Sequence, residues 1–342
     1  MSKTAAATAK RPPVDERQDI RVIQDLAPLG AGQDIPYALP ADSVFDYFYL
    51  HVHATLTTAG AGGAGGVPCP FGAYGLAQRI GILNAGRVAT LKDMPGFMYA
   101  WKEMERIGTS LEFANPLAIV GTADTVTAYD VIYPVRFVLK GLGAKKSTQF
   151  VTRGIKPILQ VQWATAEQML QGGAYGSKVL TIDWCRLLSH EQPAMAANYG
   201  QRAAFVEVRT GTREYPTLIA GTVLPNVQLV QDGLQPELWV IALDSNNAYP
   251  YAQIDGLVDR MRVKADNDKY FYDRRSAYAL QRLGAAIQAK DVIRAAFYRL
   301  KMADKARFAP AAWLQNTWEL EITPAAADLG IRFDVYGDKI VG

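Results

Sequence analysis

The stretch YFYLHVHATLTT, residues 47–58, alternates two kinds of side chain along its whole length. Every second residue is apolar, from Phe48 to Leu56, and the residues between them are tyrosine, histidine or threonine. Successive side chains of a strand point to opposite faces of a sheet, so this alternation predicts a strand with one face on a core. The opposite face would carry His51 and His53, two of the three histidines in the chain.

Two adjacent imidazoles admit two interpretations, a catalytic metal site or a polar strand face. A catalytic zinc needs about three protein ligands and an open position. Cupins, which are also jelly rolls, resemble this stretch in their His-x-His, but they place a glutamate after three or four intervening residues, where this chain has Thr57 and Thr58. His190 is the one remaining histidine, and nothing in the sequence brings it to the pair. We favour the polar strand face, and we predict no metal and no cofactor.

The same period of two recurs along the chain and predicts further strands with one buried face. Their core sides are expected to hold these sets: Leu159, Val161 and Trp163; Leu180, Ile182 and Trp184; Trp318, Leu320 and Ile322; Ile331, Phe333 and Val335. Residues 131–139 contain Pro134, which cannot donate a ladder hydrogen bond, so a bulged or edge strand is expected there. Residues 236–244 (PELWVIALD) predict a strand buried on both faces.

Helical patterns are fewer. Residues 96–107 (GFMYAWKEMERI) place Phe97, Ala100, Trp101 and Met104 along one stripe and predict a helix with one apolar side. Residues 273–300 form the longest helical pattern, with Tyr278, Leu280, Leu283, Ile287, Val292 and Ile293 as its apolar side. The end of this helix stays open, because residues 296–302 (AFYRLKM) also fit a strand.

The order of these patterns predicts an all-β protein of two consecutive sandwich-sized units, with a few helices in the connections. Residues 189–200 carry no strand pattern and are expected to join a first unit, residues 21–192, to a second unit, residues 193–342. Residues 1–20 are small and basic, and they are expected either to be disordered or to become ordered on a partner surface. The glycine-rich residues 59–70 are expected to be a loop and not a phosphate site.

Composition narrows the classes of function. The 342 residues are 49% hydrophobic and 20% charged with a net charge of +3, which does not suggest a nucleic-acid-coating protein. No apolar run reaches about 18 residues, so no transmembrane helix is expected, and the N-terminus lacks the apolar core of a secretory signal. The two cysteines, Cys69 and Cys185, lack CxxC spacing and are expected to be reduced structural thiols in a reducing cytoplasm.

Few residues could support catalysis. No GxSxG is present, and Cys185 lies too near His190 in the sequence to suggest a triad. Glu319 and Glu321, in WELEI, share one strand face as in some jelly-roll glycosidases, but solvated strand faces show the same pattern. The aromatic residues Trp239 and Trp318 could stack on sugars or belong to a core.

One basic cluster alternates along a predicted strand: Arg260, Arg262 and Lys264. Asp259 and Asp266 flank this cluster, so a salt-bridged surface is expected, with an acidic neighbouring subunit or a phosphate as the alternative.

In their order, these segments resemble the double jelly-roll major capsid proteins of tailless icosahedral viruses, and most of all those of tectivirus-like phages with an internal membrane. The resemblance begins at the quoted stretch and continues into FGAYGLAQRIGIL, residues 71–83. The matching positions of that segment are Phe71, Gly72, Leu76, Gln78, Arg79 and Ile80. Tyr133 to Val135 resemble the family's "Tyr–x–Pro–x" strand; in this chain the residues read Tyr-Pro-Val.

The resemblance implies two jelly rolls in one chain and a structural, non-enzymatic subunit. Such subunits form homotrimers with a pseudo-hexagonal outline, assemble in the host cytoplasm and tile the shell of the virion, with penton or minor capsid proteins as further partners. No catalytic, cofactor or metal residues and no sequence-specific nucleic-acid contacts are implied. The N-terminal arm would lie inside, where Lys3, Lys10 and Arg11 could meet lipid headgroups. The alternatives are a jelly-roll hydrolase of carbohydrates, using Glu319 or Glu321, and a trimeric lectin or receptor-binding spike.

Overall fold

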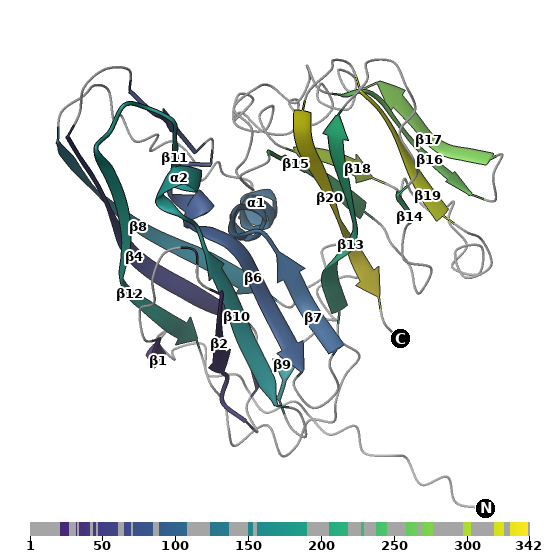
Figure 1. Cartoon of the computed structure of the whole chain (residues 1–342). Coiled ribbons are helices and arrows are strands. Elements are labelled where there is room, and N and C mark those ends of the chain that lie inside the picture. The colour runs from purple at the N-terminus through teal and green to yellow at the C-terminus, as the bar shows by residue number, and fades with distance from the viewer. Residues whose placement is uncertain are drawn as a thin grey trace, which may run out of the picture.

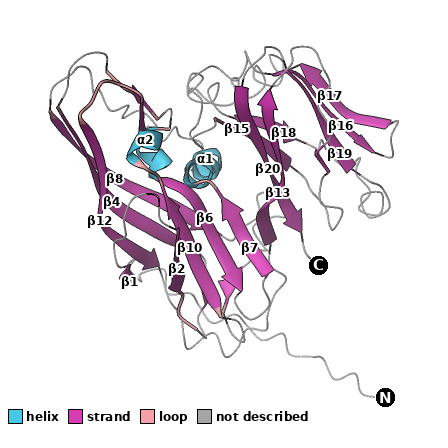
Figure 2. Ribbon diagram, viewed as in Figure 1, coloured by secondary structure: helices cyan, strands magenta, loops and turns pink. Residues whose placement is uncertain are grey.

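The computed structural model describes the chain as an assembly of strands with very few helices (Figure 2). The described residues are 21–26, 32, 34–41, 44–45, 47–60, 65–69, 71–84, 89–107, 124–136, 150–152, 156–189, 205–217, 227–228, 237–244, 258–265, 269–275, 297–301, 318–324 and 329–340. Their helices are α1 (Gly96–Ile107), α2 (Ala166–Met169) and the 3-10 helix η1 (Gly72–Leu76). The all-β class predicted from the alternation is confirmed.

The first half of the chain supplies eight main strands in two sheets. They are β1 (Arg21–Leu26), β2 (Asp34–Ala38), β4 (Tyr47–Ala59), β6 (Ala77–Asn84), β7 (Ala89–Met94), β8 (Thr125–Arg136), β10 (Pro157–Trp163) and β12 (Ser177–Ser189). One sheet has the order β1-β12-β4-β8, and the other has the order β2-β10-β6-β7. Four short strands form two further pairs: β3 (Val44–Phe45) with β9 (Phe150–Val151), and β5 (Val67–Pro68) with β11 (Leu170–Gln171).

The second half repeats this topology. Its strands are β13 (Phe205–Thr217), β14 (Val227–Gln228), β15 (Glu237–Leu243), β16 (Val258–Ala265), β17 (Lys269–Arg275), β18 (Phe297–Lys301), β19 (Trp318–Pro324) and β20 (Leu329–Ile340). The sheets run β13-β20-β15-β18 and β14-β19-β16-β17. In both halves the first, eighth, third and sixth strands form one sheet, and the second, seventh, fourth and fifth form the other. This is a jelly roll, and we call the two copies the first roll and the second roll.

The two rolls are joined through their sheets. β7, the fifth strand of the first roll, pairs in parallel with β13, the first strand of the second roll, where Lys92 is opposite Glu207. This pairing merges two four-stranded sheets into one sheet of eight strands. Helix α1 follows β7 and lies between the first roll and the strands β15, β20 and β13 (Figure 1). We call this junction the joint.

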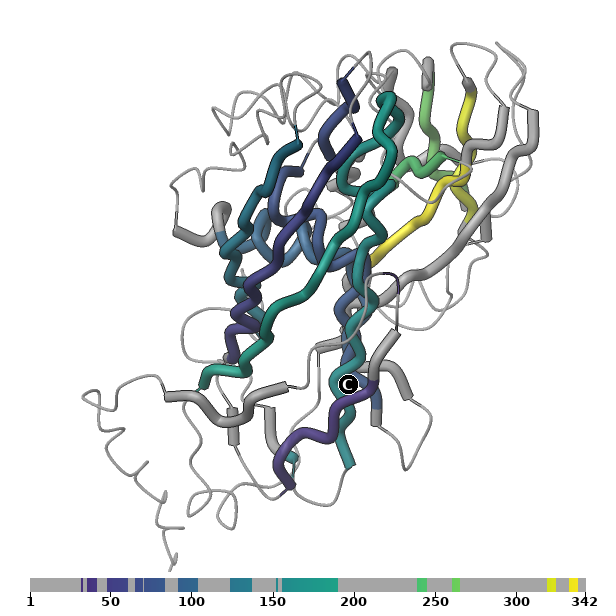
Figure 3. The backbone as a smooth tube through the Cα atoms, turned by 60° about the vertical axis from the view of Figure 1, so that its left-hand side comes forward, coloured from purple at the N-terminus to yellow at the C-terminus, as the bar shows by residue number. Residues whose placement is uncertain are grey.

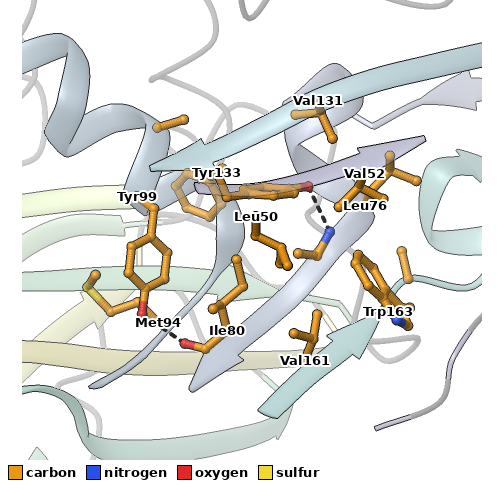
Figure 4. Close-up of a cluster of buried hydrophobic side chains, with 14 of the residues drawn as sticks. Leu50, Val52, Leu76, Ile80, Met94, Tyr99, Val131, Tyr133, Val161 and Trp163 are labelled. Atoms are coloured by element: carbon orange, nitrogen blue, oxygen red, sulfur yellow. Dashed lines mark hydrogen bonds between the residues drawn. The ribbon is translucent and has the colours of Figure 1, made fainter. Parts of the chain in front are cut away.

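The core of the first roll is built from the alternating strands. The five apolar residues of the quoted stretch (Phe48, Leu50, Val52, Ala54 and Leu56) are fully buried, as their period predicts. They pack with side chains of β6, β8 and β10, among them Tyr133, Val161 and Trp163 (Figure 4). The hydroxyl of Tyr133 accepts a hydrogen bond from the Ala77 N–H at 3.0 Å, which ties β8 to the start of β6.

The predicted face of Trp184 is wrong. A β-bulge between Ile182 and Trp184 shifts the register of β12 against β4. One extra residue reverses the side of the sheet to which the following residues point. Trp184 therefore lies opposite His53 on the outer face, while Cys185 and Leu187 continue the core side in its place.

Predictions for the other strands have mixed outcomes. β8 contains Pro134 and lies at the edge of its sheet, as expected. β15 is buried on both faces, as expected, and its residues Trp239, Val240, Ile241 and Ala242 are at most 1% exposed. The second face of β20 was expected to be polar and outside the core, but Asp334 is buried there and pairs with Arg332 at 3.1 Å. The sheet of the second roll thus packs on both sides.

Predictions for the helices are also partly corrected. The helix at Gly96–Ile107 is confirmed. It is buried on every side from Phe97 to Trp101 and not along one stripe, because both rolls surround it. The predicted helix over 273–300 is wrong at both ends, where β17 extends to Arg275 and β18 begins at Phe297. The strand alternative is realised at the second end, since β18 pairs with β15; residues 276–296 lie outside the described part of the chain.

Candidate assembly surfaces

The most prominent surface of the first roll is the outer side of β12, β4 and β8, which we call the open face. Its residues lie in rows across the three strands: Val179–Thr57–Val126, Trp184–His53–Asp130 and Arg186–His51–Ile132. Valine 126 is 69% exposed, Val179 is 54% exposed and Ile132 is 43% exposed. Figure 3 shows these strands in front, with no described helix or strand across them. Among the described residues, three of the four exposed large hydrophobic side chains belong to this face.

The two histidines of the open face are paired with carboxylates. His51 Nε2 lies 2.5 Å from Asp130 Oδ1, and His53 Nδ1 lies 2.8 Å from Asp183 Oδ2. Thr55 Oγ1 donates to the same Asp183 oxygen at 2.6 Å. Each imidazole therefore has its own acceptor, and the two rings do not converge on a common point. This geometry agrees with the favoured interpretation, a polar strand face.

Trp184 completes this cluster as a result of the bulge. Its ring is stacked on His53 at 5.6 Å between centroids and meets His51 edge-on at 4.7 Å. The Arg186 guanidinium lies over the same indole, with Cζ 4.7 Å from the centroid. The open face thus combines aromatic, aliphatic and charged groups, a composition typical of surfaces at which separately folded proteins meet.

The described residues give no support to metal or thiol chemistry. No group of three or more His, Cys, Asp or Glu side chains gathers among them in a way that could hold a metal ion. His190, the possible third ligand, lies outside the described residues. Cys69 and Cys185 are free and buried, and burial raises the pKa of each thiol to about 12. At neutral pH both are protonated, so neither is a nucleophile.

The carboxylates considered for glycoside hydrolysis are occupied by cations. Glu321 lies 2.9 Å from Arg262 Nη2 and 2.9 Å from Lys264 Nζ, and Glu319 lies 3.3 Å from Lys264 Nζ. The hydrogen bonds to Glu321 and Glu319 raise the pKa of Lys264 above its ordinary value. The expectation of a solvated face is wrong for Glu321, which is 5% exposed. Arg262 and Lys264 of the basic cluster are salt-bridged, as expected, but their partners lie across the sheet in β19 and are not the flanking Asp259 and Asp266.

The equivalent face in the second roll is covered. Its outer side carries Trp239, Ile241, Leu243 and Tyr336, which belong to the same hydrophobic cluster as the buried residues of α1. Lys102 of α1 places its Nζ 4.1 Å from the centroid of the Trp239 ring. A helix from the first roll therefore closes the outer side of the β13-β20-β15-β18 sheet.

The residues that carry the family resemblance hold α1 in this position. The ring of Phe71 stacks on Phe97 of α1 at 3.8 Å, and the hydroxyl of Tyr99 donates to the Ile80 carbonyl at 2.9 Å. Arg79 forms an ion pair with Asp93 of β7, next to the strand pairing of the joint. Gly96, the first residue of α1, could not carry a side chain, because a Cβ would lie 2.6 Å from the ring of Tyr133. These contacts fix the position of α1 between the two rolls.

Sequence reasoning missed the exposed hydrophobic residues of β8 and β12. A signal for them was present in TVTAYDVIYPVR, Thr125–Arg136, where Val126 and Ile132 fall on the same side of the strand as Asp130. Single exposed apolar residues are common, but several of them on the polar side of one sheet indicate a contact surface.

The arm residues Lys3, Lys10 and Arg11 lie outside the described residues. Of the helices that the structure describes, none has the length and apolar character needed to cross a membrane.

Comparison with known proteins supports the fold. No family model matches the chain, and no curated protein matches its sequence. A structure of Sulfolobus turreted icosahedral virus matches with a TM-score of 0.63 at 11% identity, over 94% of this chain and 91% of the other. PBCV-1 VP54, fitted into a reconstruction of the virophage Sputnik, matches with a TM-score of 0.60 at 12% identity, over 96% and 95%.

The Faustovirus major capsid protein matches with a TM-score of 0.50 at 10% identity, over 95% of this chain and 90% of the other. These likenesses extend over nearly the whole of both chains. They therefore include both rolls and the arrangement of one roll beside the other, and not one sandwich alone. This chain has the double jelly-roll fold of viral major capsid proteins.

Proposed function

We propose that this chain is the major capsid subunit of a tailless icosahedral virus and that it is not an enzyme. One observation carries the proposal: two jelly rolls are fused side by side through a continuous sheet, in a chain that matches viral capsid folds along nearly its whole length. Glu319 and Glu321, the carboxylates on which a hydrolase would depend, are bound by Lys264 and Arg262.

The assembly mechanism follows from the double fold. Three copies with two rolls each give a block with six similar lobes, and such blocks tile a closed shell. Interfaces of ordinary size suffice, because each subunit makes several and buried apolar area contributes about 25 cal/mol per Å². The subunit would assemble in the host cytoplasm and become part of the virion, with penton or minor capsid proteins at special positions of the lattice.

The finer assignments belong to the same proposal. We place the division of the chain at residues 21–192 and 193–342, which is supported by the end of β12 at Ser189 and the start of β13 at Phe205. We assign residues 1–20 to an internal arm whose Lys3, Lys10 and Arg11 contact lipid headgroups or an adjacent capsomer. The virus would then be a tectivirus-like phage with an internal membrane.

Sedimentation and imaging test the proposal. The full chain is expected to sediment as a trimer at micromolar concentration and to show a pseudo-hexagonal outline in negative stain. In purified particles it should dominate the protein mass, whereas a receptor-binding spike would be present in few copies. A chain that remains monomeric across the accessible concentrations would refute the capsid assignment.

A further inference from the structure

The ammonium group of Lys178, near the start of β12, lies among three oxygen atoms that we call the cage. Its Nζ donates to the Leu170 carbonyl at 3.0 Å, to the Gly172 carbonyl at 2.9 Å and to a carboxylate oxygen of Glu167. A lysine ammonium has three N–H donors and no acceptor, so the cage offers one oxygen for each donor. The Lys178 side chain is 15% exposed, which is little for a lysine of a half-buried strand.

The cage is built by one short segment that follows the end of β10 (Figure 1). Helix α2 of this segment begins with a capping box, in which Thr165 and Gln168 bond to each other's backbone N–H at 3.2 and 2.9 Å. The Gly172 N–H then donates to Glu167 Oε1 at 2.7 Å. Gly172 has a φ of +61°, a region that residues with a side chain rarely occupy. The segment therefore brings the three oxygens together through its own hydrogen bonds.

The charge of the cage requires a cation. Burial acts to raise the pKa of Glu167, but the hydrogen bonds from Lys178 and from the Gly172 N–H outweigh it and hold this pKa below its ordinary value. The carboxylate is therefore ionised at neutral pH, and the two carbonyl oxygens point to the same place. Without a cation, three negative oxygens would face one another, and their repulsion would open the segment.

The cage segment also holds a second connection of the first roll. Its strand β11 pairs with β5, and the Cys69 N–H donates to the Met169 carbonyl at 2.8 Å. β5 belongs to the connection between β4 and β6, whereas the cage belongs to the connection between β10 and β12. One ammonium group thus stabilises the contact between two connections that are about 100 residues apart in the chain.

We propose that residues 167–172 form a cation site that carries its own cation, the Lys178 ammonium, and that the site takes up a free ammonium ion when this side chain is removed. The tether gives the lysine a high effective concentration, so the wild-type chain needs no dissolved ion to close the segment. Calcium is a poor substitute, because it takes six to eight oxygen ligands and the cage has three. The inference goes beyond the capsid assignment and does not depend on it.

Hydrogen exchange followed by mass spectrometry tests the site in the full chain. Lys178→Met keeps most of the aliphatic stem and removes the charge. We expect the amides of Cys69 and Gly172 to exchange at least about tenfold faster in this variant, since a hydrogen bond to a charged group changes a local opening constant by about that factor. Ammonium chloride should restore slow exchange. Tetramethylammonium chloride at the same ionic strength should not, because this cation has no N–H donor.

Two further variants complete the test. Lys156→Met changes an exposed lysine just before β10 and should exchange like the wild type in both salts. Glu167→Gln removes the charge of the cage and should open the same amides, with no rescue by ammonium, because Lys178 still fills the site. It also tests the cage if Lys178→Met does not fold.

Four outcomes overturn the cation site: unchanged exchange in Lys178→Met, fast exchange that ammonium does not slow, equal restoration by the two salts, and wild-type exchange in Glu167→Gln. Trimer formation is not read out in this experiment, so each of these outcomes leaves the capsid assignment standing.

Discussion

The two rolls of this chain use the same sheet in opposite ways. In the second roll, the sheet of the first, eighth, third and sixth strands is buried on both sides, and Trp239 on its outer side is 1% exposed. In the first roll, the equivalent outer side carries Val126 at 69% exposure. The topology is the same, so the difference comes from α1, which covers one face, while no described helix or strand covers the other.

The difference lies in what covers the two equivalent faces. Helix α1 closes the outer face of the second roll at the joint, whereas no described helix or strand lies across the open face. The covered face is aromatic and aliphatic, as in a protein core, and the open face mixes histidine–carboxylate pairs with exposed valines. The first and last of the following substitutions test whether the two faces differ in energy as they do in structure, and the other two test what holds each roll together.

The largest effect is expected at the covered face. Trp239→Ala would remove a fully buried indole between α1 and β15, and we expect a loss of about 4 kcal/mol in the free energy of unfolding. Val126→Ala, on the open face, should change the monomer by less than about 0.5 kcal/mol. Urea denaturation followed by circular dichroism measures both. Equal losses would show that the covered and open faces do not differ as proposed.

A slightly smaller effect is expected within the second roll, at its ion-pair network. Glu321→Gln leaves Arg262 and Lys264 without their buried carboxylate, which should cost about 3 kcal/mol of stability. Glu319→Gln is the matched control, because Glu319 is more exposed and contacts Lys264 alone of these two cations. Denaturation midpoints compare the two variants. Loss of glycosidase turnover in either variant, from a measurable wild-type activity, would instead favour the hydrolase.

The link between β8 and the start of β6 can be tested at Tyr133. Tyr133→Phe deprives the buried Ala77 N–H of its acceptor, and we expect a loss of about 2 kcal/mol. Tyr175→Phe removes a similar acceptor from the Gly66 N–H at a part-buried site, where water can replace it, so the loss should be smaller. Thermal unfolding of both variants checks the order. A reversed order would mean that this hydrogen bond is not what ties β8 to β6 in the first roll.

The smallest effect on the monomer is expected at the open face. Asp130 is 65% exposed, so Asp130→Asn should change monomer stability by less than about 1 kcal/mol. If a second copy covers this face, the same change should weaken the trimer more than it destabilises the monomer. Sedimentation equilibrium and denaturation on the same samples separate the two effects. An equal effect on both would argue against burial of His51–Asp130 in the assembly.

Several features could be predicted from the sequence because they depend on local periodicity. The alternation at Phe48–Leu56 placed five residues in the core correctly, and Pro134 located an edge strand. The apolar run at 236–244 indicated a strand buried on both faces, which the structure confirms. The helix at Gly96–Ile107 followed from its own pattern.

Other features could not be predicted, because they depend on contacts between distant segments. The bulge before Trp184 arises from the pairing of β12 with β4, and no local pattern marks it. The burial of Glu321 depends on the cations of β16 and on the packing around that sheet. Both ends of segment 273–300, which was expected to be a helix, are strands. At its second end β18 pairs with β15, and periodicity alone does not reveal this pairing.

The sequence by itself therefore determined that this protein is a series of half-buried strands sufficient for two sandwiches, since a period of two is a property of neighbouring residues. Only the tertiary structure decided that the sandwiches share a sheet, that α1 covers one face, and that His51 and His53 lie on the equivalent face of the other roll, across which no described helix or strand lies. These relations join residues far apart in the chain, and their geometry is set by strand pairing and by the burial of apolar surface between the rolls.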